Sequence, residues 1–96
     1  MIQYDFTTRI WKHPGKGGWC FVSLPTEISR EIRAHFKWQE EGWGRMKVSA
    51  VVREVEWQTA IWFDKKRDTY LLPLKADVRK RAGLKIGEIV AVQIRI

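Results

Sequence analysis

The chain has few side chains that could act as nucleophiles or metal ligands: one cysteine, Cys20, and two histidines, His13 and His35. Cys20 paired with either histidine could act as a nucleophile, because an imidazole can take the thiol proton. However, Cys20 lies in the apolar run 19–24, where a small buried thiol is the ordinary case. His35 lies beside an apolar helical stripe and is expected to pack there. There is no Cys-x-x-Cys or His-x-x-x-His spacing, so the sequence predicts no metal site and no cofactor.

Glu54 and Glu56 are a candidate pair of carboxylates for acid–base chemistry. They are two residues apart, so in extended backbone they point to the same side of the chain. Arg53 and Arg45 are close in sequence, and a surface ion-pair arrangement accounts for the same residues. We therefore predict no catalytic residues and no enzymatic activity.

Binding is the better-supported class of function, because cations and large aromatic side chains are both in excess. The chain has 18 Lys and Arg against 11 Asp and Glu, and a net charge of +7 attracts polyanions. The predicted basic face for nucleic acid or another polyanion consists of Lys65, Lys66, Arg67, Arg79, Lys80, Arg81 and Lys85. Two of the six tryptophans, Trp11 and Trp62, fall on the wetter faces of their expected strands, where they could stack unpaired bases.

The same residues also fit simpler roles, and the sequence does not decide among them. Ordinary solubility and a solvated helix face account for the cations. Trp11 and Trp62 could instead line a pocket for a small molecule, contact a protein partner, or pack under a helix or in a dimer. The sequence therefore predicts polyanion or nucleic-acid binding first, and small-molecule or protein-partner binding second. A monomer or a weak homodimer is expected.

The elements that must position these residues are mostly strands. Alternation, and apolar runs bounded by Gly and Pro, predict six strands over residues 2–11, 19–24, 45–53, 57–63, 69–74 and 89–96. A helix whose inward stripe includes Ile28, Ile32 and Phe36 is expected after Pro25, and a shorter basic helix after Pro73. Short strands with little helix indicate a small barrel or sandwich.

One structural plan occurs twice in the chain. A strand ends in Leu-Pro, and a helix, a glycine turn and another strand follow; the copies contain Leu24-Pro25 and Leu72-Pro73. This near-repeat predicts an internal pseudo-twofold, in which each half of a barrel completes the core of the other half. Chance recurrence of a common unit is the alternative.

The second copy resembles the half-barrel of AbrB- and MazE-type bacterial regulators. The matching segments are Leu72-Pro73 for the strand end, Val78-Arg79-Lys80 for the basic helix, Gly83-Leu84 for the helix stop and Gly87-Glu88 for the turn. Those proteins assemble a swapped-hairpin barrel from two chains, whereas the duplicated plan would let this chain build it alone. The resemblance implies DNA binding only in part, because the loop of the first copy, Gln39-Glu40-Glu41, is neutral to acidic and would not attract DNA.

A resemblance over nearly the whole chain is to a bacterial family of uncharacterised small barrels, the domain of unknown function nineteen-oh-five. The shared motifs are Gly-Gly-Trp-x-Phe-Val-x-Leu-Pro at 17–25, Gly-x-Gly-x-x-Lys-Val at 42–48, Trp-x-Thr-x-Ile at 57–61 and Tyr-x-Leu-Pro-Leu-Lys-x-x-Val-Arg-Lys at 70–80. The resemblance implies a mainly β fold: a small closed double-split β-barrel of about six strands with two short helices. It implies no activity.

Length and composition set the remaining limits. With 96 residues there is room for one domain, 1–96. No apolar run approaches the roughly 18 residues of a membrane span, and the N-terminus lacks a signal-peptide pattern. Together with the single cysteine, these features favour the cytoplasm and no membrane partner.

Overall fold

The computed structural model describes residues 2–15 and 17–96, except for the side chain of Trp43. The strands in this part of the chain are β1 (Gln3–Arg9), β2 (Trp11–Lys12), β3 (Cys20–Ser23), β4 (Arg45–Val52), β5 (Val55–Asp64), β6 (Thr69–Pro73) and β7 (Ile89–Arg95). The helices are α1 (Thr26–Phe36), α2 (Ala76–Ala82) and two short 3-10 turns, Lys37–Gln39 and Gly42–Gly44. None of these helices has both the length and the apolar character that crossing a membrane requires.

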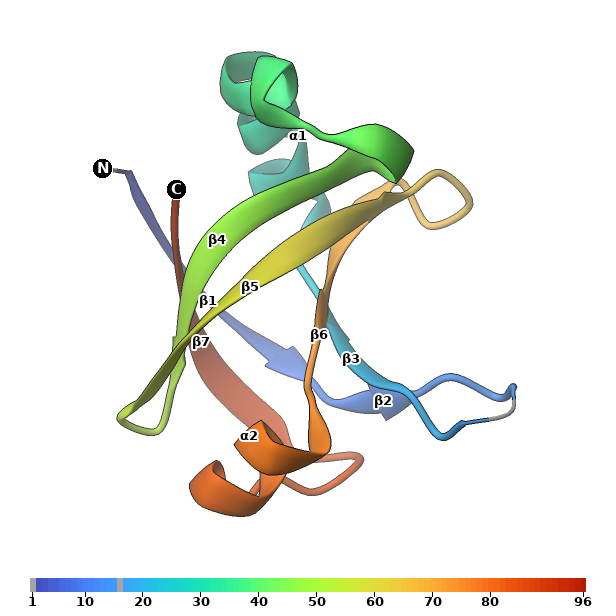
Figure 1. The fold of residues 1–96 in the computed structure, drawn as a ribbon, viewed down its shortest axis with the longest axis vertical. Helices are drawn as coiled ribbons and strands as arrows, with labels where there is room; N and C mark the ends of the chain where they lie inside the picture. Colours follow the sequence, from blue (N-terminus) through green and yellow to red (C-terminus); the bar gives the residue numbers. More distant parts are fainter. Residues whose placement is uncertain (1, 16) are drawn as a thin grey trace.

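The strands form one antiparallel sheet that curls into an open half-barrel (Figure 1). The strand order is β1-β7-β4-β5-β6-β3-β2, so the two edge strands are consecutive in the chain. The helices α1 and α2 lie at opposite ends of the half-barrel (Figure 1). The prediction of a mainly β protein with two helices is confirmed.

The predicted closed barrel of about six strands is not what the structure shows. The expected first strand is broken at Ile10 into β1 and β2, which gives seven strands in the described residues. Ile10 is buried. Its N–H donates a hydrogen bond to Glu88 O, and its C=O accepts one from Gly87 N–H, both at 2.8 Å. The chain therefore bends there, and β1 stays with β7 without pairing with β3 in the described residues. Across the opening, Thr8 Oγ1 donates a hydrogen bond to Ser23 O at 3.0 Å.

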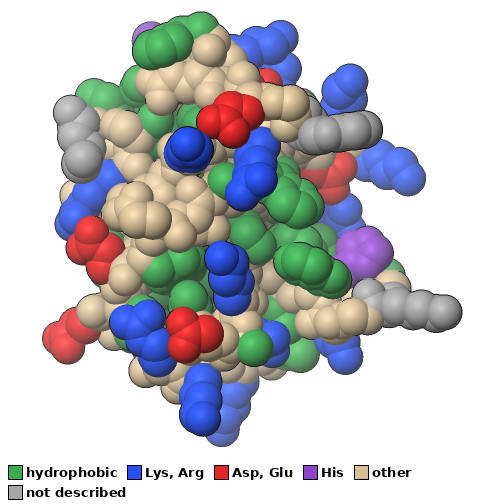
Figure 2. Space-filling model, in the orientation of Figure 1, with side chains coloured by type: hydrophobic (Ala, Val, Ile, Leu, Met, Phe, Trp, Pro, Cys, Tyr) green, Lys and Arg blue, Asp and Glu red, His purple; other side chains and the backbone are tan. Residues whose placement is uncertain are grey.

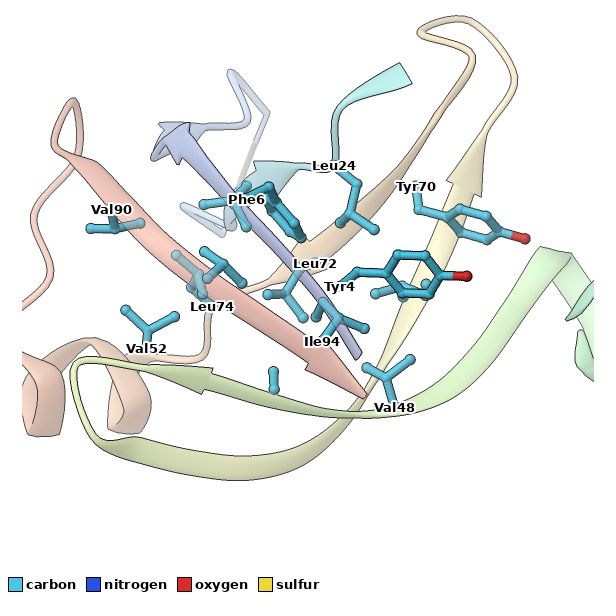
Figure 3. Packing of buried hydrophobic residues seen from close by; sticks show 14 of the residues in the cluster. Tyr4, Phe6, Leu24, Val48, Val52, Tyr70, Leu72, Leu74, Val90 and Ile94 are labelled. Atoms are coloured by element: carbon cyan, nitrogen blue, oxygen red, sulfur yellow. The ribbon is translucent and has the colours of Figure 1, made fainter. Parts of the chain in front are cut away.

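The inner side of the curled sheet holds the hydrophobic core (Figure 3). Alternate residues of β4 are buried, namely Met46, Val48, Ala50 and Val52, as the alternation that predicted this strand implies. Tyr70 and Leu72 from β6 are fully buried in the same cluster. Burial of a large apolar side chain contributes roughly 1.5–3 kcal/mol, so packing against this shared core holds the curvature of the sheet.

Strands β3 and β6 pair with a symmetric register. Leu24 N–H donates to Tyr70 O, and Leu74 N–H donates to Cys20 O, both at 2.9 Å. Leu24 and Leu74 are fifty positions apart in the sequence, and so are Cys20 and Tyr70. The two α-helices also begin fifty positions apart. This register is the pattern that a twofold relation between the two halves would produce.

The same register corrects the alignment of the Leu-Pro repeat. Pro25 immediately precedes α1, whereas Pro73 is the last residue of β6 and lies opposite Phe21. The residue that corresponds to Leu24 is therefore Leu74, whereas the Leu-Pro pattern aligns Leu24 with Leu72. The prolines differ in position because a proline is tolerated both before a helix and at a strand end.

The glycine stop predicted for the second helix is confirmed. Gly83 follows α2 with a φ of 64°, in the left-handed region that glycine adopts without a steric cost. Leu84 N–H then donates to Arg79 O at 2.8 Å, which satisfies a carbonyl at the helix end. This cap fixes the direction in which the chain leaves the basic helix.

Candidate functional site

The seven predicted cations fall into two groups at opposite ends of the molecule (Figure 1). The turn between β5 and β6 carries Lys65, Lys66 and Arg67, whereas α2 and the loop after it carry Arg79, Lys80, Arg81 and Lys85. Strand β6 separates the groups, and a five-residue strand spans roughly 15 Å. The structure therefore does not bring these side chains together on one face.

Among the seven cations, Arg67 and Arg79 have close polar neighbours, whereas Arg81 Nη1 lies 3.8 Å from Asp77 Oδ2 in an exposed ion pair on α2. Arg67 Nη1 lies 2.6 Å from Asp64 Oδ2, and its guanidinium lies 4.5 Å from the centre of the Trp11 ring. Burial alone would raise the pKa of Asp64, but hydrogen bonds from the Arg67 side chain and from two backbone N–H groups, with the Arg67 charge, hold that pKa below its ordinary value. On α2, Arg79 Nε donates to Leu74 O at 3.1 Å. Their remaining donors are available to a ligand.

Trp11 and Trp62 both lie on the outer side of the sheet, but their surroundings differ. Trp62 lies opposite Leu71 and is 40% exposed. Trp11 is half-buried between Phe21 and Arg67, and its Nε1 donates to Ser23 Oγ at 3.0 Å. Trp62 can therefore offer a ring to a ligand, whereas Trp11 mainly supports Arg67.

Trp19 is a candidate residue that the sequence reasoning missed. It is 55% exposed, and its ring stacks on Phe21 with centroids 6.4 Å apart and planes 15° apart. Because strand side chains alternate, Trp19 and Phe21 point away from the core that Cys20 and Val22 enter. The alternation was present in the sequence, but the continuous apolar run hid it.

Trp19 and Trp62 are shared by two adjoining clefts. The apolar cleft has a volume of about 460 Å³ and is lined by His13, Gly15, Trp19, Phe21, Trp62, Asp64, Arg67 and Leu71. The cationic cleft has a volume of about 430 Å³ and is lined by Trp19, Arg45, Lys47, Gln58, Thr59, Ala60, Trp62, Pro73 and Lys75. We call the two together the tryptophan groove. On the face shown in Figure 2, exposed hydrophobic side chains lie beside Lys and Arg.

The charges of the tryptophan groove are unevenly distributed. Among the residues that the structure describes, the cationic cleft is lined by three cations and by no carboxylate. Lys47 Nζ lies 3.7 Å from Glu41 Oε1, but both side chains are exposed, so that ion pair is weak. A third hollow of about 270 Å³ continues from Trp19 and Lys75 to Arg79. Arg67 and Arg79, one from each predicted basic group, therefore border this series of clefts.

The residues considered for covalent or metal chemistry have other hydrogen-bond partners. Cys20 is buried, and its Sγ lies 3.6 Å from Gly18 O. His13 Nδ1 accepts a hydrogen bond from Gly15 N–H at 3.0 Å. His35 is exposed, against the expectation that it packs, because other α1 residues take the inward positions. Within residues 2–15 and 17–96, no three His, Cys, Asp or Glu side chains gather as they would around a metal ion.

Among the described residues, Glu54 and Glu56 do not form the expected ion pairs with Arg45 and Arg53. Glu56 accepts from Ser49 Oγ at 3.2 Å and lies 3.5 Å from Arg95 Nη1. Arg53 instead pairs with Glu88, at 2.7 Å, since a left-handed turn at residues 53 and 54 directs it toward the end of α2. Both pairs join neighbouring elements, so they serve the fold.

The fold and the groove together define a class of protein: a small, curled antiparallel β domain that presents tryptophans and cations on its outer surface. Residues 6–94 match the model of the family described as "Domain of unknown function (DUF1905)". The chain belongs to this family, which confirms the resemblance found in the sequence motifs. The comparison with curated proteins gives no match. The resemblance to AbrB- and MazE-type regulators stays a prediction.

Proposed function

We propose that this protein is a binding module and that its tryptophan groove binds a polyanion. The observation that carries the proposal is the cationic cleft, where Arg45, Lys47 and Lys75 lie beside two exposed tryptophans and none of the described lining residues is a carboxylate. Clustered cations of this kind concentrate anions, and the net charge of +7 adds to the attraction at long range. The groove is therefore a better candidate than the predicted basic face, whose members lie at two ends of the molecule.

The salt dependence of binding gives the proposal a magnitude. Three phosphates neutralised on a single strand release counterions, which gives a slope of log K against log salt of about −2. Removal of two of the three cations should reduce the slope to about −0.7. A control variant can lose the same number of charges outside the groove. Comparison of the two variants then distinguishes an effect of the groove from an effect of net charge.

The test compares variants with equal loss of charge. Binding of heparin and of a labelled mixed-sequence oligonucleotide is measured by anisotropy from about 50 to 200 mM salt. Arg45→Gln/Lys75→Gln should weaken binding and flatten the slope, whereas Lys80→Gln/Arg81→Gln on α2 should do so much less. Equal losses would show an effect of net charge alone, and a larger loss from the α2 variant would move the site to α2. Absence of binding at low salt would end the proposal.

A small molecule or a protein partner is the second candidate ligand. The apolar cleft favours it, since aromatic and aliphatic walls with a few polar groups, here His13, Asp64 and Arg67, are typical of small-molecule sites. A ligand of this kind would bind with little dependence on salt. Its binding would be lost in Trp62→Ala and kept in the Arg45→Gln/Lys75→Gln variant.

We also propose the finer description of the fold and its setting. The symmetric register of β3 and β6 supports a double-split barrel with an internal pseudo-twofold, of the kind that the AbrB- and MazE-type resemblance suggests. The single cysteine, Cys20, supports a cytoplasmic location. A monomer or a weak homodimer remains the proposed state, which sedimentation would test.

A further inference from the structure

We infer that the polyanion is single-stranded nucleic acid, with one unpaired base held in the apolar cleft between Trp19 and Trp62. This inference rests on the proposed function, because it identifies the ligand of the same groove. It assigns the sugar-phosphate backbone to the cationic cleft and a base to the apolar cleft. Each assignment follows from the side chains that line the cleft.

Trp19 and Trp62 are both held in place with part of the indole ring exposed to solvent. Trp19 stacks on Phe21 on one side, which leaves 55% of the residue in solvent. A Cβ at Gly17 would lie 3.1 Å from Trp19 Nε1, so any larger residue there would press on the indole, and the φ of 95° at Gly17 also favours glycine. Trp62 sits on β5 opposite Leu71 and is 40% exposed. Rings fixed by a strand and by a neighbouring ring lose little entropy when a base stacks on them.

The charges divide the ligand between the two clefts. Asp64 lines the apolar cleft, and its depressed pKa keeps the carboxylate ionised at neutral pH. Arg67 already pairs with this carboxylate, so the apolar cleft has no excess of cations to attract a phosphate, whereas a neutral base can stack there and donate an amino or imino hydrogen to the carboxylate. The cationic cleft has the opposite character, with Arg45, Lys47 and Lys75. A nucleic-acid strand can bind in both clefts only if its sugar-phosphate backbone lies in the cationic cleft and a base lies in the apolar cleft.

A duplex cannot make this contact, because its bases are paired and stacked inside. A polyanion without bases can occupy only the cationic cleft. The apolar cleft has a volume of about 460 Å³, within the range of roughly 300–1,000 Å³ that holds small organic molecules. Arg67 at its edge, held by Asp64 and Trp11, keeps guanidinium donors for a base acceptor or the adjoining sugar.

The experiment compares four probes of equal length or charge: a single-stranded mixed-sequence oligonucleotide, its duplex, the same strand without bases, and heparin. Affinities are measured by anisotropy of the labelled probe at constant salt. The single strand should bind roughly fivefold to a hundredfold more tightly than the abasic strand, the range expected for one stacked base. Trp62→Ala and Trp19→Ala should remove this difference while they leave abasic-strand and heparin binding in place.

Two matched variants keep the result interpretable. Trp62→Phe retains a stacking ring and should restore most of the advantage of the single strand. Trp38→Ala removes a tryptophan that is 79% exposed but lines neither cleft, and it should change nothing. Equal affinity for the single and abasic strands, or tighter binding of the duplex, would overturn this inference and leave the proposed function intact. Failure of heparin and every oligonucleotide to bind would overturn both.

Discussion

Replacement of Tyr70 by Phe tests a buried polar contact that fastens the segment after α1 to the sheet. Tyr70 is fully buried, and its hydroxyl donates to Glu40 Oε1 at 2.5 Å. The same oxygen accepts from Arg33 Nη1 at 3.3 Å, and the Arg33 guanidinium lies 3.8 Å from the centre of the Phe63 ring. The Glu40 side chain is 12% exposed, so little water can replace the hydroxyl.

The magnitude follows from the charge of the acceptor. A hydrogen bond to an ionised group contributes about 1.5–3 kcal/mol, and Phe fills nearly the same volume as Tyr. We expect Tyr70→Phe to lower the free energy of unfolding by about 2 kcal/mol. For a domain of this size that corresponds to a fall in Tm of roughly 8–16 °C.

The pH dependence provides a second readout of the same contact. Burial, followed by the hydrogen bond to Glu40 and the Glu40 charge, raises the pKa of Tyr70 above its ordinary value of 10.0. Above that pH the unfolded chain loses the phenol proton while the folded protein keeps it, so stability falls as pH rises, by up to about 1.4 kcal/mol per pH unit. Phe has no proton to lose. The difference between the two proteins should therefore shrink above pH 10.

Urea unfolding followed by circular dichroism, at neutral pH and again above pH 10, measures both effects. Tyr4→Phe is the matched control, because Tyr4 is 8% exposed and its hydroxyl makes no hydrogen bond within the described residues. The control should cost less than about 0.5 kcal/mol. If Tyr70→Phe costs no more than the control, the reasoning about a stabilising buried contact is refuted.

Three further predictions concern backbone conformation and acid stability. Gly83→Ala should destabilise the protein by about 1 kcal/mol in urea, because Gly83 has a φ of 64° and open space around it; Gly42→Ala, with open space and no such φ, should cost less. Gly17→Ala should shift the Trp19 indole and lower oligonucleotide affinity; unchanged affinity would contradict the argument that Gly17 helps to position this ring. Since the folded-state pKa of Asp64 lies below 3.8, its stabilisation is present above that pH and is lost as pH falls through the lower folded value. Urea midpoints should therefore drop more steeply below about pH 4 in the wild type than in Asp64→Asn, and parallel curves would contradict this.

The strands could be predicted from local sequence patterns because alternate residues of each strand face the same core. The alternation from Met46 to Val52 fixed which side of β4 is buried, and the structure agrees. The break at Ile10 was not predictable from such a pattern, because the alternation continues through it. The bend depends on hydrogen bonds to Gly87 and Glu88, which are far away in sequence.

The candidate site was harder to predict than the fold because it is assembled from four separate segments. Trp62 was identified from strand parity, and it lines both clefts. The same parity applied to Trp19 would have placed it beside Phe21 on the outer face. Lys75 and Arg45 approach each other only through the curl of the sheet, which no local pattern records. The two basic groups looked adjacent because they flank a short strand, and the length of that strand is what separates them.

The pairing of the first strand with the last has a consequence for the order of synthesis. Gln3 lies opposite Arg95, so β1 has no partner strand until β7 has been synthesised, some ninety residues later. At about 5–20 residues per second, that interval is roughly 5–20 s. The β4–β5 hairpin, closed between Val52 and Val55, needs only neighbouring residues and can form in microseconds once it emerges. During this interval Tyr4 and Phe6, which are buried in the folded protein, have no partner strand to pack beside and stay exposed in the nascent chain.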